Sequence, residues 1–386
     1  MRLLHTSDWH VGKAIRGRSR NEEFAAALDE VVSIAIDEDV DAVLLAGDVY
    51  EQRAASPEAD SIVFDALLRL HDAGVRVVAI PGNHDSAVRL EALGKLLRPL
   101  GTDIAHQVMP PDRGGIVEVA SRDGSEVAGV ACVPFVPERR FGDAAELFEA
   151  SERWYLSYAE GMGELLAAMA GGFRPDRVNV VLAHLFTDGA LLGGGEREAS
   201  IGMVYAISPS RLPGEAVYIA LGHVHRPQSV KGSPAPARYA GSLIQLDFGE
   251  TDQRKSVTVV EASPGKPAKV REVPLSAGRR LLDVRGTLDE VVAKVDEVGD
   301  AFLRVFVKTD GPVPGIADRV REALPNALDV HLEYERAEAA TGSEPVSSLH
   351  PRDQFVAYYR SQHGAVPREE LIEAFDEVLA LETEGA

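Results

Sequence analysis

The feature that most constrains this chain is a series of short apolar runs that each end in polar residues. The runs are "RLLHTSD", "DAVLLAGD", "VRVVAIPG", "VNVVLAHL" and "AVYIALGHVH". Helical patterns separate at least the first three, and continuous apolar strands between amphipathic helices are typical of buried strands in a layered α/β domain. Because side chains at the carboxyl ends of neighbouring strands converge on one crevice, we expect the polar residues to form a single site.

The polar residues that follow these runs carry oxygen and nitrogen atoms that can bind metal ions. They are Asp8, His10, Asp48, Asn83, His184, His223 and His225. A lone "GD" or "DxH" is common, whereas "GNHD" and "GHVH" arise rarely by chance. His184 taken alone is better explained as an ordinary hydrogen-bonded histidine. The shared position of the whole set behind apolar runs is what predicts metal ligation.

The residue types indicate the kind of metal and the reaction. Neutral imidazole, carboxylate and amide oxygen suit Mn²⁺, Fe²⁺ or Zn²⁺, and the lack of thiolates argues against a structural zinc site. Seven ligands are too many for one ion that must also keep a position for substrate, so two ions that share a carboxylate are expected. Two ions about 3.5–4 Å apart can activate a water and clamp a phosphoester. The pattern therefore predicts phosphoester hydrolysis.

Composition narrows the class of protein. The chain has 386 residues, 45% of them hydrophobic, and a formal net charge of −21. Such a charge argues against a protein that holds nucleic acid by bulk electrostatics, although local basic patches stay possible. The single cysteine, Cys132, lies in an apolar run and excludes a disulfide framework. No apolar run approaches the ~18 residues of a membrane span, so we expect a soluble, cytoplasmic protein without a membrane contact.

Two short basic segments are candidates for DNA contact. The segment "GKAIRGRSR" reads as a loop close to the first ligands and carries Lys13, Arg16, Arg18 and Arg20. Such a loop can follow a phosphate backbone into the site, and the alternative is a solvated loop. The segment "PERRF", with Arg139 and Arg140, is a weaker candidate, for which a surface salt bridge is the alternative.

Local signals also mark several elements. Ser56, Pro57 and Gly74 predict a helix over residues 57–74. Residues 237–249 and 255–263 read as strands, and "SPGKPAK", residues 263–269, reads as a turn or surface loop. From about residue 275 the pattern is strand, helix, strand, helix, strand, with the first of these helices over residues 289–298. We therefore expect a main domain over 1–274, a small α/β domain over 275–336, a linker over 337–348 and two helices within 349–386.

The motifs "DWH", "GD", "GNHD", the lone His184 and "GHVH" resemble those of the calcineurin-like metallophosphoesterases, in the same order. Longer stretches, such as "MRLLHTSDWHVGK", "YIALGHVHRPQ" and "YAGSLIQLDFGE", resemble the SbcD family, the nuclease subunits of bacterial SbcCD complexes and relatives of double-strand-break repair nucleases. The resemblance implies a layered β-sandwich phosphoesterase domain flanked by helices, with a small α/β cap domain over 275–336 and C-terminal helices.

This resemblance also implies roles for the site residues. One metal would be held by Asp8, His10, Asp48 and His225, and the other by Asp48, Asn83, His184 and His223. The family usually uses Mn²⁺. His84 would stabilise the charge of the scissile phosphate or protonate the leaving oxygen, while Asp85 would orient that imidazole or cap its turn. Glu51 stands where some relatives carry a second histidine, and we assign it no role on the phosphate.

Finally, the resemblance implies partners. The ATPase SbcC, which has a long coiled coil, would bind the C-terminal helices through apolar faces built on Phe355, Tyr359, Leu371 and Phe375. The alternative is that these faces pack back on the cap domain. Family members also form homodimers within a heterotetramer, and the helical patterns over 62–70 and 90–97 could provide the dimer contact.

The sequence thus predicts a Mn²⁺-dependent DNA exonuclease and endonuclease that processes double-strand breaks and hairpins with an SbcC-type ATPase, in the cytoplasm and at the nucleoid. A phosphomonoesterase on the same fold is the first alternative, although "GDVYEQR" and "GNHD" differ from the "GDxxDRG" and "GNHE" of protein phosphatases. A non-catalytic scaffold of an ATPase complex is the second, and the complete set of ligands argues against it.

Overall fold

The computed structural model describes residues 1–148, 157–196, 206–334, 351–363 and 366–384. The predicted linker over 337–348 lies outside the described residues. The chain divides into two compact units, and the first comprises residues 1–308 and 314–332. The second comprises residues 309–313 and 333–386, whose helices are described separately below.

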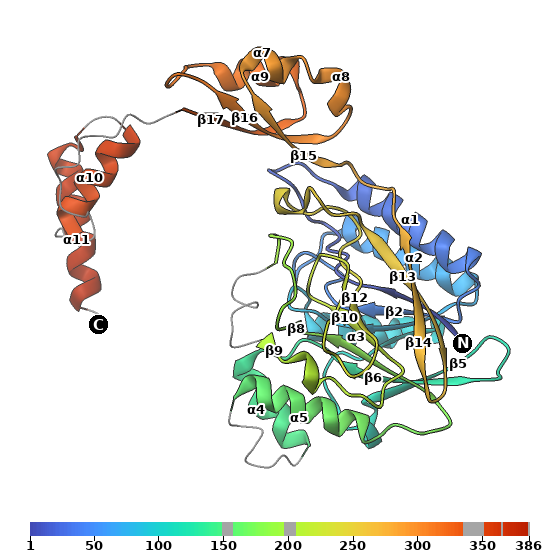
Figure 1. The fold of residues 1–386 in the computed structure, drawn as a ribbon. Helices are drawn as coiled ribbons and strands as arrows, with labels where there is room; N and C mark the ends of the chain where they lie inside the picture. Colours follow the sequence, from blue (N-terminus) through green and yellow to red (C-terminus); the bar gives the residue numbers. More distant parts are fainter. Residues whose placement is uncertain (149–156, 197–205, 335–350, 364–365, 385–386) are drawn as a thin grey trace. The chain divides into compact units, whose positions relative to one another are not determined.

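Two six-stranded sheets form the centre of the first unit (Figure 1). The first sheet has the order β14-β13-β1-β2-β3-β4, with strands β1 (Arg2–Thr6), β2 (Ala42–Ala46), β3 (Arg76–Ile80), β4 (Thr102–Ile104), β13 (Ser256–Ser263) and β14 (Lys266–Pro274). The second has the order β11-β12-β10-β7-β6-β5, with strands β5 (Ile116–Ala120), β6 (Val127–Val133), β7 (Val178–His184), β10 (Tyr218–Gly222), β11 (Gln228–Ser229) and β12 (Ala237–Tyr239). Strands β1 to β3 run parallel to one another, as do β7 and β10.

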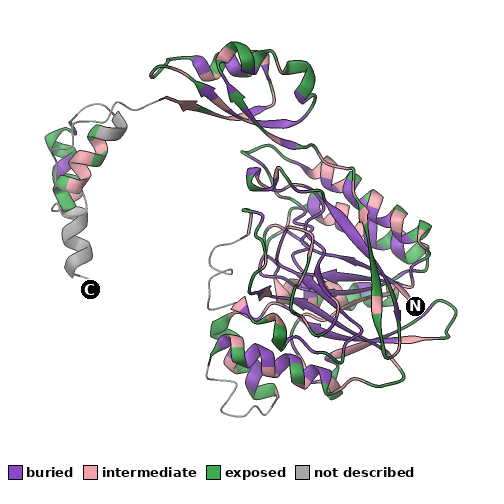
Figure 2. Cartoon of the chain, viewed as in Figure 1, coloured by how far each residue is buried: buried purple, intermediate pink, exposed green. Residues whose placement is uncertain are grey.

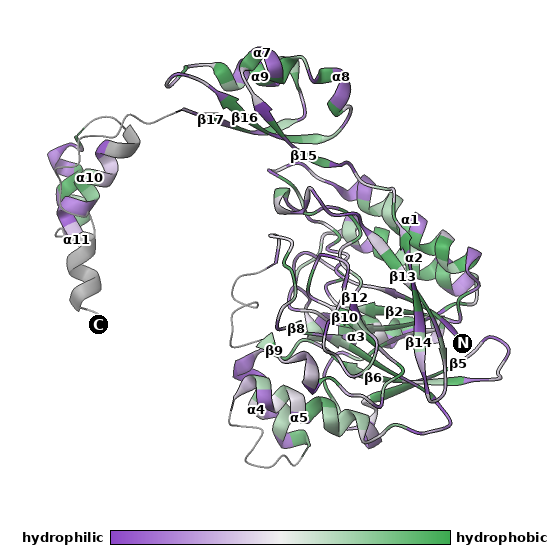
Figure 3. Cartoon of the chain, viewed as in Figure 1, coloured by the Kyte–Doolittle hydropathy of each residue, from purple (hydrophilic) through white to green (hydrophobic). Residues whose placement is uncertain are grey.

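The two sheets pack face to face because alternate residues of each strand point to opposite sides. Leu44 and Val78 of the first sheet belong to the same buried apolar cluster as Val180 and Ala220 of the second. Figure 2 shows the inner strands of the two sheets mainly as buried segments, and Figure 3 shows them as largely hydrophobic, whereas the edge strand β14 is mostly exposed. Residues of opposite parity, such as Val43, face outward into a cluster with the helices.

Helices cover both outer faces of this sandwich. The first sheet is covered by α1 (Asn21–Asp37), α2 (Pro57–Asp72) and α3 (Ala87–Leu97). The second is covered by α4 (Glu138–Leu147) and α5 (Tyr158–Ala170). The expected layered α/β sandwich flanked by helices is therefore confirmed.

Local signals predicted some elements better than others. Helix α2 begins as expected, since the Ser56 hydroxyl accepts a hydrogen bond from the Ala59 amide, and Gly74 follows its end with a φ of 73°. The expected strand over 237–249 is wrong beyond Tyr239, because the chain continues irregularly to a short helical turn, η5 (Phe248–Glu250). The expected loop over 263–269 is also wrong from Lys266, where β14 begins. Strand β14 lies at a sheet edge with mostly exposed side chains, so no apolar alternation marks it.

A three-stranded sheet of order β15-β16-β17 follows, with strands β15 (Leu281–Gly286), β16 (Phe302–Lys308) and β17 (Ala327–Glu333). Between the strands lie α7 (Leu288–Val292), α8 (Val295–Val298) and α9 (Ile316–Ala323), so the helix expected over 289–298 is two short helices.

The second unit contains two helices, α10 (Pro351–His363) and α11 (Glu369–Glu384). The rings of Phe355 and Phe375 stack with their centroids 4.3 Å apart and an interplanar angle of 6°. Each helix therefore uses part of its apolar face to pack on the other. Leu371, by contrast, is 41% exposed. No helix in the described part of the chain is both long and apolar enough to cross a bilayer.

Candidate metal centre

The carboxyl ends of five strands bring the predicted ligands to one place. Asp8 follows β1, Asp48 follows β2 and Asn83 follows β3, while His184 ends β7 and His223 follows β10. All of these side chains are buried, as are those of the two remaining predicted ligands, His10 and His225. The strands belong to two sheets, so the site lies where the sandwich brings both sets of strand ends together.

The first group of donors combines residues from β1 and β10. Single ligand atoms of Asp8, His10 and His225 lie within 4.8 Å of one another. The two imidazoles meet through their Nε2 atoms, which are 3.1 Å apart. The Asp8 carboxylate also accepts a hydrogen bond of 3.0 Å from the His223 amide, which ties the two strand ends together.

The second group combines residues from β3, β7 and β10. The Asn83 Oδ1 atom lies 3.0 Å from His184 Nε2 and 2.9 Å from His223 Nδ1. These two ring nitrogens are themselves 3.2 Å apart. An amide oxygen and two ring nitrogens therefore point at one small volume.

Asp48 stands between the two groups. Its Oδ2 atom lies 3.6 Å from His10 Nε2 and 3.4 Å from His184 Nε2. Its Oδ1 atom accepts a hydrogen bond of 2.8 Å from the His84 amide, which fixes the carboxylate plane. The arrangement agrees with a bridging role for this carboxylate.

The outer nitrogens of the histidines have partners of their own. His10 Nδ1 lies 2.8 Å from a Glu51 carboxylate oxygen, and His225 Nδ1 lies 3.1 Å from a Glu250 carboxylate oxygen. His184 Nδ1 donates to the backbone carbonyl of Ala46 at 2.7 Å. Because these partners accept the Nδ1 proton, the Nε2 atoms of the neutral rings present lone pairs to the centre.

Two lone pairs that face each other at this distance repel unless a proton or a metal ion lies between them. The His10 and His225 Nε2 atoms face each other, and His184 Nε2 faces the Asn83 carbonyl oxygen, which can only accept. Ligands of this type and spacing fit divalent metal ions that prefer nitrogen and oxygen. Sequence reasoning did not find the roles of Glu51 and Glu250. The position of Glu51, three residues after Asp48, is a weak sign in the sequence that it lies near the site. The sequence around Glu250 gives no such sign.

The electrostatics of the centre also favour positive charge. Burial lowers the pKa of His184, but the charges of Asp48 and Asp8, together with the hydrogen bonds to Asp48 and Ala46, outweigh this effect and raise that pKa to about 9. Burial likewise raises the pKa of Asp48, yet His184 and His10 hold it well below its usual range. Burial lowers the pKa of His10 to about 4, so this imidazole is neutral near pH 7. A bare centre therefore takes up a proton where a cation would sit.

The backbone at the centre is strained. Asp8, His10, Asp48 and His223 have φ values of 50°, 48°, 52° and 100°. Residues other than glycine rarely adopt such values, and they persist where the surrounding structure enforces them, which is common at functional sites. Four of the predicted ligands therefore occupy unfavourable backbone conformations that direct their side chains inward.

His84 and Asp85 take different roles. The Glu51 backbone carbonyl accepts a hydrogen bond of 2.9 Å from His84 Nδ1, and this bond holds the ring. The Asp85 carboxylate accepts hydrogen bonds from the amides of Val49, Tyr50 and Gly82 at 3.1, 3.0 and 2.9 Å. Of the two roles expected for Asp85, it therefore performs the capping of the turn, and Glu51 orients the imidazole.

The basic loop after the first ligands is largely occupied by contacts within the protein. Lys13 Nζ lies 3.1 Å from a Glu51 oxygen, and Arg16 Nε lies 2.8 Å from an oxygen of Asp329 in β17. Arg18 donates to the Pro325 carbonyl at 3.1 Å. Arg20 is 2% exposed and pairs with Glu23, so its predicted contact with DNA is corrected to a structural role.

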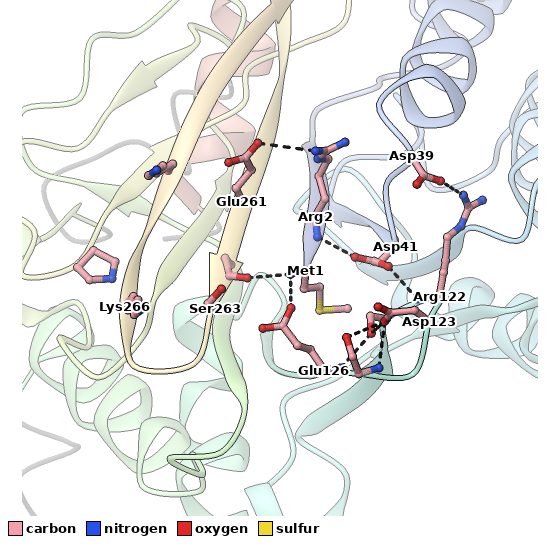
Figure 4. Close-up of a pocket in the computed structure, with 15 residues that line it drawn as sticks. Met1, Arg2, Asp39, Asp41, Arg122, Asp123, Glu126, Glu261, Ser263 and Lys266 are labelled. Atoms are coloured by element: carbon pink, nitrogen blue, oxygen red, sulfur yellow. Dashed lines mark hydrogen bonds and ion pairs between the residues drawn. The ribbon is translucent and has the colours of Figure 1, made fainter.

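A pocket of about 660 Å³ lies at the other ends of the strands, next to Met1 and the hairpin turns (Figure 4). Most of its charged residues are paired. Arg2 donates its amide to Asp41 at 2.7 Å, Arg122 pairs with Asp39, and the Met1 ammonium pairs with Glu126. Lys266 and Lys269 also line it, but among the described residues no group of potential metal ligands lies there, so the buried centre is the better candidate for chemistry.

Fold and site together define a metallophosphoesterase. The profile of the calcineurin-like phosphoesterase family matches residues 1–227, and the SbcD_C profile, described as the type 5 capsule protein repressor C-terminal domain, matches residues 277–363. The chain is 33% identical to the SbcD subunit of the SbcCD nuclease of Bacillus subtilis (strain 168), covering 98% of this chain and 97% of the relative.

Two other relatives are SbcD subunits of SbcCD nucleases as well. The Rhodobacter capsulatus protein is 33% identical, covering 85% of this chain and 86% of its own, and the Escherichia coli K12 protein is 28% identical, covering 92% of each. The chain therefore belongs to the calcineurin-like phosphoesterases and, within them, to the SbcD family.

Proposed function

We propose that this chain is the metal-dependent nuclease subunit of a complex with an SbcC-type coiled-coil ATPase, and that it hydrolyses DNA phosphodiester bonds as an exonuclease and endonuclease. The observation that carries the proposal is the pair of donor groups that share the Oδ2 atom of Asp48, 3.6 Å from His10 Nε2 and 3.4 Å from His184 Nε2. The names of its relatives, each the SbcD subunit of an SbcCD nuclease, support the choice of substrate.

Two divalent ions are expected, most simply Mn²⁺. One would be held by Asp8, His10, Asp48 and His225, and the other by Asp48, Asn83, His184 and His223. When bound, such a pair supplies a nucleophilic water at neutral pH and neutralises charge on the phosphodiester. Two carboxylates hold the candidate ligands in place, since Glu51 and Glu250 fix the rings of His10 and His225.

His84 is the residue that we expect to exchange a proton with the substrate. Its Nδ1 proton is retained by the Glu51 carbonyl at 2.9 Å, so Nε2 is the atom left for the ester. A proton on Nε2 would stabilise the charge of the phosphorane or pass to the leaving oxygen. Asp85, by capping the turn, keeps His84 in position.

Other parts of the chain are expected to bind partner proteins. We propose that α10 and α11 bind the coiled coil of the ATPase, with Tyr359 and the 41% exposed Leu371 in contact and Phe355 and Phe375 holding the helix pair together. Two chains would form a homodimer within a heterotetramer that processes double-strand breaks and hairpins at the nucleoid, in the cytoplasm. We also propose that the domains of the chain end at residues 274, 336 and 348. Lys13, Arg16 and Arg18 are proposed as further contacts with DNA.

The test compares substrates and variants of the full-length chain, with and without the ATPase. Mn²⁺ is supplied with end-labelled duplex, hairpin and circular single-stranded DNA, and in parallel with a small phosphomonoester. We expect hydrolysis of DNA, and a loss of about 10²–10⁴-fold in His84→Ala with the metal content unchanged.

Two results would contradict the proposal. Hydrolysis of the monoester alone would identify a phosphomonoesterase on the same fold. No hydrolysis of any substrate by a chain that carries its full metal content would identify a scaffold.

A further inference from the structure

We propose that a pocket beside the second group of donors binds the phosphate that neighbours the scissile one on a single DNA strand. The proposal rests on the proposed nuclease function and assigns a path for its substrate. The pocket has a volume of about 230 Å³. Its walls are the loop after β2, which carries Arg53, the beginning of α3, and the beginning of α4, which carries Arg139 and Arg140.

The pocket opens directly beside the metal centre. Asn83 lines it and also supplies the Oδ1 atom that lies between His184 and His223. Phe135 lines it too, with its ring stacked 6.0 Å from that of His223 at an interplanar angle of 16°. A strand whose scissile phosphate lies at the donors therefore reaches this pocket with its next phosphate.

The three arginines at the pocket are exposed. In the part of the chain that the structure describes, none of Arg53, Arg139 and Arg140 forms an ion pair. The arginines of the basic loop differ, because Arg16 and Arg20 are already paired with Asp329 and Glu23. Planar guanidinium groups that have no partner suit phosphate oxygens.

The positive ends of two helices at the pocket also favour an anionic ligand. Arg139 and Arg140 lie in the first turn of α4, where the helix dipole is positive and a cation is unfavourable. The pocket also contains the beginning of α3 at Ala87, a second positive helix end. Two like charges held against a dipole weaken α4, so their placement needs a reason other than stability, and an anionic ligand supplies it.

The pocket continues as a groove that can hold more than one nucleotide. A second pocket of about 230 Å³ shares Phe135, Pro137 and Arg140 with the first, and extends along α4 to Leu147. Val88, which is 74% exposed, lines both pockets. The second pocket also contains the carboxylates of Glu91 and Asp143, so the phosphate belongs in the first pocket, while a base can contact the apolar side chains of the second.

The test measures binding and hydrolysis separately. Binding of a labelled single-stranded oligonucleotide is followed by fluorescence anisotropy with EDTA present, over a range of salt concentrations. We expect the triple variant Arg53→Gln/Arg139→Gln/Arg140→Gln to bind about tenfold more weakly, and the slope of log K against log[salt] to fall by about 0.7 for each phosphate that the variant no longer binds. With Mn²⁺, KM for the oligonucleotide should rise, while hydrolysis of bis-p-nitrophenyl phosphate, which is too small to span the groove, should be unchanged.

Controls separate the possible outcomes. Arg174→Gln removes an exposed arginine that pairs with Asp176 and should change nothing. Arg139→Lys should recover part of the binding, and Arg139→Gln should leave the melting temperature equal or higher, because it relieves the dipole. An unchanged Kd and salt slope in the triple variant would overturn the proposal, and so would equal losses on both substrates. A wild-type chain that hydrolyses the small ester but no DNA would instead overturn the proposed function.

Discussion

Glu51 and Glu250 distinguish the two groups of donors. Both histidines of the first group donate Nδ1 protons to carboxylates, at 2.8 Å for His10 and 3.1 Å for His225. In the second group, His184 donates to the neutral carbonyl of Ala46. A carboxylate partner makes an imidazole a more basic ligand and adds negative charge near the ion. The first group should therefore bind its ion more tightly than the second.

The variant Glu51→Gln tests this difference. We expect the affinity of the first ion to fall about 10–100-fold and the second ion to be bound as before, because His10 is the only candidate ligand that loses a charged partner. The ions retained per chain are counted during competition with a chelator. Glu215→Gln, which neutralises an exposed acid in the turn before β10, is the matched control. Equal weakening of both ions would refute the assignment.

The convergence of the candidate ligands could be predicted from the sequence because each follows an apolar strand, and the position of strand ends in a sheet is a general rule. Glu250 could not, because its contact with His225 depends on how the loop after β12 folds back on the site. The Asp329 partner of Arg16 was equally hidden, whereas Glu23 lies only three residues from Arg20. A count of charges identifies the basic loop. It does not identify the ion pair between Arg16 and Asp329, because these residues are 313 positions apart and meet only in the folded chain.

The turns that follow the strands need glycine because chains approach closely there. A Cβ atom on Gly82 would lie 2.2 Å from Asp48 Oδ1, and one on Gly222 would lie 1.9 Å from the Ala46 carbonyl oxygen. Neither contact can be relieved by a side-chain rotation alone, since the Gly82 Cβ would also lie 2.5 Å from the Asp48 backbone nitrogen and the Gly222 contact is with the backbone itself. The glycines of "GNHD" and "GHVH" therefore allow two strand ends to meet at the metal centre.

Gly82→Ala should disrupt the centre more than the fold. The added methyl must displace Asp48, the shared ligand, so we expect loss of both ions and a drop in stability of about 1–3 kcal/mol from overpacking. Metal content is measured by elemental analysis and stability by denaturant unfolding. Gly142→Ala is the matched control, because nothing lies within 4 Å of its added Cβ. A Gly82→Ala chain with both ions bound would show that the approach can relax.

Elements with strong local signals were the predictable ones. Helix α2 has a capping serine, a proline at its start and an apolar stripe, and all three act within the helix itself. Strand β14 owes its existence to pairing with β13, so its own residues are mostly exposed and give no pattern. The helix expected over 289–298 is interrupted at Lys294, between two short helices. The periodicity of the apolar residues does not reveal this interruption.

In the first unit, contacts join the region near the metal centre to the three-stranded sheet. Ile15 and Phe248 form an apolar cluster with Leu281 and Phe302. Arg16 adds an ion pair with Asp329 of β17. Part of the charge that the sequence places near the site, that of Arg16, is therefore used to hold this sheet. The net charge of −21 agrees with a local grip on DNA.

The proposed homodimer is the property of the whole molecule that is most directly tested. Leu68 on α2 is 44% exposed and Leu96 on α3 is 72% exposed, although the opposite faces of both helices are buried. If a second copy covers these leucines, Leu96→Glu should convert the dimer to a monomer in light scattering, while Val270→Glu, at another exposed apolar position, should leave the mass unchanged. Because each chain is strongly acidic, the dimer should also tighten as salt screens the repulsion. A Leu96→Glu chain that stays dimeric would place the contact elsewhere, and a wild-type chain that is monomeric at every concentration and salt would exclude the homodimer.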